Sequence, residues 1–243
     1  MATTRAQLIQ QVALRMDEVS PEIEADDLVV DGSDGNPLYT LIDGLIDAGT
    51  LELFSVAPYW RLKQETFDNP QYEAVGSDRE IDDGKGTVSA RYMIRLKLPD
   101  DFLRVAEINC SEFQRPITEA VPEISEMGKR QHNPFLMGRG ARPVGVLSHG
   151  VWSGSPCREI DCYSVSTNSV ANLVATYIPR PAVISDDVSD PVTVEDAVPE
   201  VLIPALQWLI AARTFGARGD ANHAAICQQT AQNLLKLRSE ERF

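Results

Sequence analysis

The sequence has little that would support membrane insertion, a disulfide framework or a metal centre. It lacks an apolar run of about 18 residues, so we predict no membrane-spanning helix. Its first residues lead directly into an amphipathic pattern rather than a signal-peptide core, so we expect assembly and function in the cytoplasm or in a particle built there. Cys110, Cys157, Cys162 and Cys227 do not have zinc-ligand spacing with one another or with histidine. We therefore predict buried free thiols, no disulfide, no metal and no cofactor.

Positive charge is also scarce. The chain has 22 Lys and Arg against 36 Asp and Glu, a formal net charge of −14. A protein that holds nucleic acid over its whole surface neutralises phosphates with cations, so this composition argues against that class. Two interpretations remain: the carboxylates keep the protein soluble, or they line a passage through which DNA slides without sticking. The second interpretation depends on a ring-shaped assembly.

Catalytic motifs are missing. The segment Trp152–Pro156 contains two serines but lacks the Gly-x-Ser-x-Gly frame of a nucleophile elbow. The three histidines, His132, His149 and His223, stand in unlike contexts, and Gly84-Lys85-Gly86 lacks the frame of a phosphate-binding loop. We predict that the chain is not an enzyme.

The N-terminal part has the pattern of two helices. Thr4 and Gln7 have the spacing of a capping box, and apolar residues follow at helical intervals up to Pro21. Asn36-Pro37 predicts the start of a second helix, in which Gly44 and Gly49 weaken the helix or admit a close neighbour. The predicted buried stripe of this helix is Leu38, Leu41, Ile42, Leu45 and Ile46. Residues 1–62 also carry eleven carboxylates against Arg5, Arg15 and Arg61.

The central part has the pattern of strands. Alternating apolar residues over 87–98, from Val88 to Leu98, give the clearest strand signal. Further strands are predicted over 102–109, 144–152, 158–165 and 171–178. We expect about five antiparallel strands in one small sheet or sandwich.

The C-terminal part predicts two helices separated by Gly219-Asp220. Pro199 suits a first helical turn, and Pro204 is expected to bend the helix that follows. The predicted fold class is α+β, with N- and C-terminal helices forming one bundle and an inserted antiparallel β-sheet or sandwich. The predicted parts are 1–63 (helical), 64–180 (β-rich insertion) and 181–243 (helical, same bundle).

One segment departs from the acidic pattern. Residues 128–142 contain no carboxylate, and glycine and proline predict an irregular loop. Its candidate contact residues are Lys129, Arg130, His132, Phe135, Arg139 and Arg142. Docking on an acidic neighbouring subunit and an ordinary solvated loop fit this pattern equally well, and contact with nucleic acid ranks third.

Several short segments carry a family resemblance through their order and spacing. They are Ala57-Pro58-Tyr59-Trp60, the run from Leu98 to Arg104, Gly219-Asp220 between the last helices, Arg115-Pro116-Ile117-Thr118 and Gln131-His132-Asn133-Pro134. In this order the chain resembles head-to-tail connector, or neck ring, proteins of tailed bacteriophages. It looks most like the ring proteins of crAss-like, podovirus-type phages of gut Bacteroidales.

The resemblance implies a virion structural protein without catalytic activity, assembled in the bacterial host cytoplasm. It implies a ring of identical copies, dodecameric in such families, that binds the portal protein. DNA would pass through the ring, and the next tail or collar component would dock on it. The alternative is another virion or surface β-module that attaches to a ligand or glycan, with Trp152 and Tyr163 as stacking aromatics.

Overall fold

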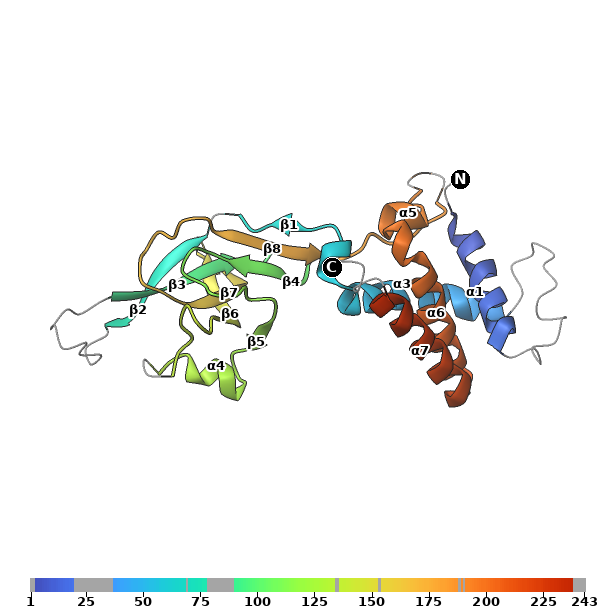
Figure 1. Ribbon diagram of the computed structural model, residues 1–243. Helices are drawn as coiled ribbons and strands as arrows, with labels where there is room; N and C mark the ends of the chain where they lie inside the picture. The colour runs from blue at the N-terminus through green and yellow to red at the C-terminus, as the bar shows by residue number, and fades with distance from the viewer. Residues whose placement is uncertain are drawn as a thin grey trace. The chain divides into compact units, whose positions relative to one another are not determined.

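The chain forms two compact units in this computed structural model. Unit 1 joins residues 1–62 to residues 180–243, and unit 2 comprises residues 63–179. The structure describes residues 3–19, 37–68, 70–77, 90–133, 136–152, 154–187, 189 and 191–237. Helices and antiparallel strands are both present, so the predicted α+β class is confirmed (Figure 1).

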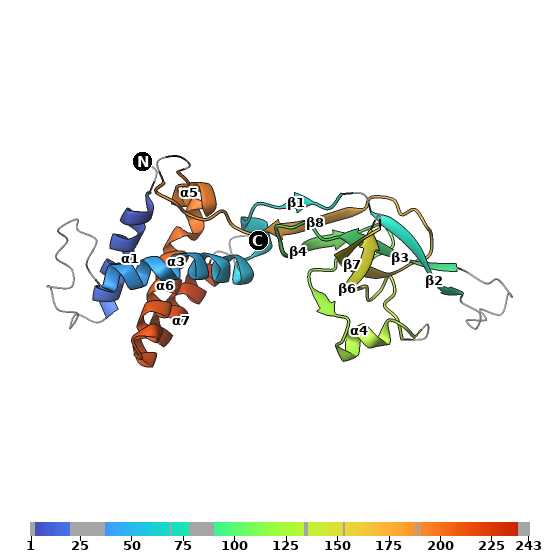
Figure 2. The same ribbon diagram turned by 180° about the vertical axis from the view of Figure 1, so that it is seen from behind.

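Unit 1 is helical. Its elements are α1 (Arg5–Val19), α3 (Pro37–Val56), η1 (Tyr59–Arg61), α5 (Val194–Ala197), η2 (Glu200–Leu202), α6 (Ile203–Ala217) and α7 (Ala221–Leu237). The central helix is α6, which contacts α1, α3 and α7 (Figures 1 and 2). This position explains why α6 has buried residues around most of its circumference rather than along one stripe.

The first helix begins as the sequence predicts. The Thr4 amide donates to Gln7 Oε1 at 3.0 Å, and the Gln7 amide donates to Thr4 Oγ1 at 3.2 Å. Two amides that a helix start leaves without intrahelical partners are satisfied in this way. Helix α1 then buries Leu8, Val12 and Met16.

The buried stripe of α3 is narrower than predicted. Leu38, Ile42 and Ile46 are buried, whereas Leu41 and Leu45 are only half-buried. The buried row continues through Gly49 and Leu53, so one narrow face of the helix is buried along its length. Leu41 and Leu45 lie at the edge of that face.

Gly49 permits the close approach of α3 to α6. A Cβ atom at this position would lie 2.6 Å from Ile210 Cγ1, which is too close for any real contact. At Gly44 nothing lies within 4 Å of such an atom. The predicted close neighbour therefore exists at Gly49 and not at Gly44.

The prediction that Pro204 bends a helix is wrong. A 3₁₀ turn, η2, precedes α6, so Pro204 falls in the first turn of α6. Amides in a first turn have no intrahelical acceptor, so a proline there removes no backbone hydrogen bond and need not bend the helix. The break predicted at Gly219-Asp220 is confirmed: Gly219 has φ +83°, and Asp220 Oδ1 accepts the His223 amide at 3.1 Å.

The described residues of unit 2 form eight strands in two sheets. The strands are β1 (Glu65–Thr66), β2 (Gln71–Ser77), β3 (Ala90–Lys97), β4 (Phe102–Asn109), β5 (Ala120–Pro122), β6 (Val144–Trp152), β7 (Ser155–Val165) and β8 (Val174–Pro179). One sheet has the order β1-β8-β4 and the other β2-β3-β7-β6-β5. Among these described strands, β5 pairs with β6 in parallel, and the other pairs are antiparallel.

The two sheets share one hydrophobic core. The larger sheet contributes Ile94 and Leu96 from β3 and Ile160 from β7, and the smaller sheet contributes residues of β4 and β8 such as Ile108 and Tyr177. Alternation places Ile94 and Leu96 of β3 and Ile160 and Cys162 of β7 in this core, and Arg95 and Asp161 between them on the opposite face of the larger sheet. The arrangement is a small β-sandwich.

Several strand predictions are confirmed, and their number is corrected. Strands β4 and β6 have the predicted ends, β7 begins earlier than predicted, and β8 begins later. About five strands were expected, and the part of the chain that the structure describes has eight, because short strands such as β5 show no alternation in the sequence. Val88, part of the strongest predicted strand, lies outside the described residues.

Candidate functional site

The segment predicted to be an irregular basic loop contains a short helix. Helix α4 spans Glu126–Arg130, beside β5 at the side of unit 2 (Figures 1 and 2). Its first turn is capped by Ser125, whose hydroxyl accepts the Gly128 amide at 3.0 Å. A Cβ atom at Gly128 would lie 2.5 Å from the carbonyl oxygen of Pro122. We call residues 123–142 the α4 segment.

Buried polar contacts attach the α4 segment to the sandwich. The Gln131 side chain is buried; its amide donates to the Met127 carbonyl at 2.8 Å, and its Oε1 accepts the Gly138 amide at 2.6 Å. Ser164 of β7 donates from its hydroxyl to the Gly138 carbonyl at 2.8 Å. Buried hydrogen bonds of this kind hold a segment in one geometry. These contacts attach the described residues of the α4 segment to β7 through Gly138.

The predicted cations of the α4 segment differ in whether they form ion pairs. Arg130 forms an ion pair with Glu126, and His132 Nε2 lies 3.7 Å from Glu123 Oε1. Lys129 is exposed, and no partner carboxylate lies against it among the described residues.

Arg139 and Arg142 are joined to each other through their backbones, and neither forms an ion pair within the described part of the chain. Phe135 lies outside the described residues. Carboxylates just before residue 128 thus offset part of the predicted basic character, leaving the α4 segment with a net charge of +2.

Three large apolar side chains on the same segment face solvent. Ile124 is 82% exposed, Met127 51% and Leu136 58%. We call these residues, together with Lys129 and Arg130, the α4 surface. Large apolar side chains gathered on one exposed segment mark interaction sites more often than single ones do. Sequence reasoning missed them because an apolar residue beside a turn is normally read as core.

Negative charge is concentrated in unit 1. Residues 1–62 and 180–243 carry 20 carboxylates against nine Lys and Arg, whereas unit 2 carries 16 against 13. Unit 1 therefore has a net charge of −11 and unit 2 of −3. The acidic character predicted for the N-terminal third extends to residues 186–200, which precede α6, whereas α6 and α7 themselves carry no carboxylate.

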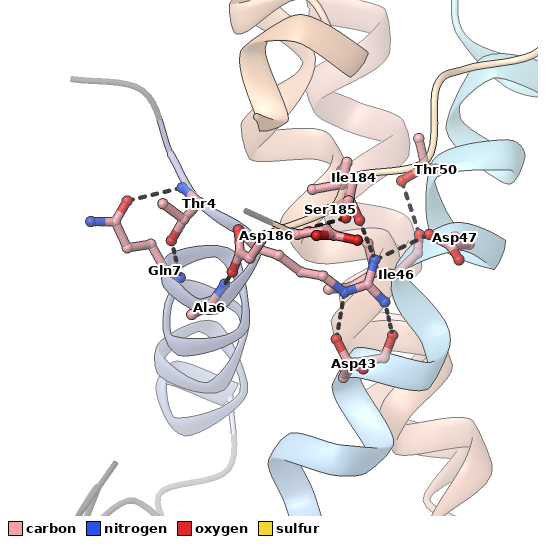
Figure 3. Close-up of polar contacts among 12 residues, drawn as sticks. Thr4, Ala6, Gln7, Asp43, Ile46, Asp47, Thr50, Ile184, Ser185 and Asp186 are labelled. Atoms are coloured by element: carbon pink, nitrogen blue, oxygen red, sulfur yellow. Dashed lines mark hydrogen bonds and ion pairs between the residues drawn. The ribbon is translucent and has the colours of Figure 1, made fainter. Parts of the chain in front are cut away.

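Arg5 organises part of this acidic unit, and Figure 3 labels its acceptors Asp43 and Ile184. Its guanidinium donates to Asp43 Oδ1 at 2.6 Å and to the carbonyl oxygens of Asp43 and Ile184 at 2.8 Å and 2.7 Å. Asp186 accepts the backbone amides of Arg5 and Ala6 at 2.8 Å and 3.0 Å (Figure 3). One cation thus joins α1, α3 and the connector that precedes α5.

A second charged cluster lies on the face of the larger sheet that points away from the shared core. Arg95 Nε contacts Asp161 Oδ1 at 2.8 Å and Glu159 Oε1 at 3.1 Å, and Arg95 Nη1 contacts Glu73 at 2.6 Å. Glu159 is only 2% exposed, and its Oε2 has no hydrogen-bond partner among the described residues. Desolvation by burial raises the pKa of Glu159, and Arg95 offsets this only in part.

The aromatic residues considered for ligand stacking have different surroundings. Tyr163 is buried in a small cluster with Met93 and Val146, so the interpretation of Tyr163 as a stacking residue is wrong. Trp152 is half-buried and lines a cleft of about 470 Å³ at the end of β6 and β7. An adjoining hollow of about 340 Å³ shares Trp152 and Asp100 and adds Asp68.

The cysteines also differ from one another. Cys110, Cys162 and Cys227 are buried as predicted, whereas Cys157 is half-buried. Burial raises the pKa of the Cys227 thiol to about 11. Across the residues that the structure describes, no group of three or more His, Cys, Asp or Glu is arranged to hold a metal ion.

No helix within the described ranges has the length and apolar character needed to cross a membrane. Comparison with protein-family models and with curated proteins finds no match for this chain.

Proposed function

We propose that this chain is a structural subunit that closes into a ring of identical copies and serves as a head-to-tail connector in a tailed bacteriophage. In this proposal the helices from both ends of the chain act as one bundle that carries the β-sandwich as an insertion. The ring sits below the portal protein in the virion neck, DNA passes through it, and the next tail component docks on it. The chain acts through geometry and not through catalysis.

The main support is the pairing of two unlike surfaces on one chain. A closed ring uses heterologous contacts, so each subunit needs two different and complementary surfaces. Unit 1 has a net charge of −11, and the α4 surface of unit 2 offers cations and exposed apolar side chains on a firm support. Opposite charges of this kind fix the register between copies.

The excess of carboxylates suits a passage for DNA. A wall that offers DNA few cations releases few counterions, so the duplex does not lodge on it. Unit 1 holds most of this excess, and we propose that parts of it face the lumen.

Substitutions on the α4 surface test this proposal better than deletion of residues 129–142. Deletion would remove buried Gln131 and Met137 and the contact of Gly138 with Ser164, and the sandwich would be disturbed. Lys129→Glu with Arg130→Glu changes exposed side chains and removes no buried contact, although Arg130 loses its ion pair with Glu126. Light scattering is expected to show a closed oligomer for the unchanged chain, alone or with portal protein, and smaller species for this variant. An unchanged mass for the variant would remove the α4 surface from the assembly.

A second candidate function rests on the Trp152 cleft. An aromatic ring beside Asp68, Lys97 and Asp100 combines a stacking face with hydrogen-bonding groups, the composition that sugar recognition needs. A glycan array is expected to give a signal that Trp152→Ala abolishes if the β-sandwich is an attachment module. Retention of the ring in that variant would separate this role from assembly.

A further inference from the structure

The α4 surface has features of a docking surface and not of a solvated turn. Ile124, Met127 and Leu136 remain exposed although Gln131 and Gly138 of the same segment are fixed to β7. A segment held this firmly loses little further freedom when a partner binds, so its exposed apolar area contributes more fully to affinity.

We infer that the α4 surface binds the acidic segment 22–34 of a second copy of this chain. The inference rests on the proposed ring and names the surface that each copy offers to its neighbour. Segment 22–34 lies outside the described residues, so its sequence alone enters the argument. It follows α1 and precedes α3, both of which belong to unit 1.

The two partners match in charge. Segment 22–34 has no Lys or Arg, and its carboxylates are Glu22, Glu24, Asp26, Asp27, Asp31 and Asp34. The α4 segment has a net charge of +2, and among the described residues Lys129, Arg139 and Arg142 form no ion pair. Such cations are available to carboxylates of a partner without breaking existing pairs.

The two partners also match in apolar character. Leu28-Val29-Val30 stands at the centre of segment 22–34, between Asp27 and Asp31. An apolar core with a charged rim is the usual anatomy of a protein interface. The α4 surface has the same composition, with Ile124, Met127 and Leu136 beside Lys129 and Arg130.

Nucleic acid fits the same surface less well. A phosphate backbone would meet Glu123 and Glu126 next to the cations, and Ile124, 82% exposed, would stay in water. A polypeptide with carboxylates around an apolar centre satisfies both parts of the surface. The observations therefore favour a protein partner.

A synthetic peptide covering residues 21–36 tests the contact directly. The receiving protein is the full chain in which residues 22–34 are replaced by a Gly/Ser linker of equal length, so that its own segment cannot compete. We expect the peptide to bind, and Lys129→Glu with Arg130→Glu to weaken binding by roughly tenfold or more. Arg115→Glu, an exposed cation outside the α4 segment, is the matched control and should leave binding unchanged. Equal binding by all three proteins, or no binding, overturns the inference.

A mixing experiment tests whether the contact forms between copies. The linker-replaced chain lacks the donor segment, and the Lys129→Glu, Arg130→Glu chain lacks the receiving surface. Each alone should stay monomeric, and an equimolar mixture should form a dimer with a single productive contact. Two monomers in the mixture overturn docking between copies. A complete ring formed by the linker-replaced chain also overturns this inference but leaves the proposed ring function standing, because other contacts would then close it.

Discussion

At the scale of single residues, the chain uses buried or partly buried charge in two different ways. Arg5 is surrounded by acceptors that satisfy its guanidinium, whereas Glu159 retains an oxygen without a partner in the described structure. A satisfied charge stabilises a fold, and an unsatisfied one imposes a cost that depends on ionisation.

Arg5→Ala is expected to lower the free energy of unfolding of the chain by about 2 kcal/mol, because hydrogen bonds to charged groups carry more energy than neutral ones. The loss separates α1 from α3 and from Ile184. Urea denaturation followed by circular dichroism measures it. Arg218→Ala, at an exposed position of the same unit, should change the unfolding free energy by less than about 0.5 kcal/mol. Equal effects of the two changes would contradict the role given to Arg5.

Glu159→Gln is expected to remove a pH dependence. The folded-state pKa of Glu159 is raised by burial, so the fold favours its protonated form. The associated stability is therefore present below the unfolded-state pKa, near 4.5, and is lost as the pH rises through the folded-state value. The variant should gain stability relative to the unchanged chain as the pH is raised from acid to neutral.

Denaturation curves at a series of pH values measure this difference. Glu119→Gln, at an exposed position, serves as the control and should track the unchanged chain at every pH. A difference between Glu159→Gln and the unchanged chain that does not vary with pH would contradict the assigned cause.

At the scale of elements, the sequence predicts what depends on local pattern and misses what depends on partners. The ends of β4 and β6 and the start of α1 followed from alternation and from the Thr4–Gln7 capping pattern. Strand β5 and helix α4 were missed because so few residues show no period. The parallel pairing of β5 with β6 is fixed by packing and leaves no local signal.

The residue types of the candidate site could be predicted from the sequence, but their contacts and exposure could not. The cations of the α4 segment could be read from the chain, but their pairing with Glu123 and Glu126 and the exposure of Ile124 required the fold. The Arg95 cluster also escaped prediction. Glu159 and Asp161 alternate with Ile160 and Cys162 like solvent-facing residues of a strand, yet both are buried where β7 lies between β3 and β6.

Two glycines of α3 provide a matched test of helix packing. Gly44→Ala is expected to stabilise unit 1 by about 0.5–1 kcal/mol, because alanine favours the helix and the new methyl group meets open space. In Gly49→Ala the same gain is opposed by a clash with Ile210, and overpacking of this kind costs about 1–3 kcal/mol. Thermal unfolding should therefore place Gly49→Ala below Gly44→Ala. The reverse order would contradict the packing of α3 against α6.

At the scale of the whole molecule, the two units supply different surfaces for the contacts between copies in the proposed ring. Unit 1 supplies negative charge, and unit 2 supplies the α4 surface, which is attached to β7 through Gly138. A ring with this contact should be sensitive to salt, because exposed ion pairs weaken as ionic strength rises. The apolar contribution of Ile124 and Met127 should persist under the same conditions.

Electron microscopy of the native assembly that contains this chain is the most direct measurement of its role. We expect a rotationally symmetric collar at the neck, with a central opening and the α4 segment of each subunit against its neighbour. Density for the chain as separate, non-contacting copies, or at a site without rotational symmetry, would contradict it.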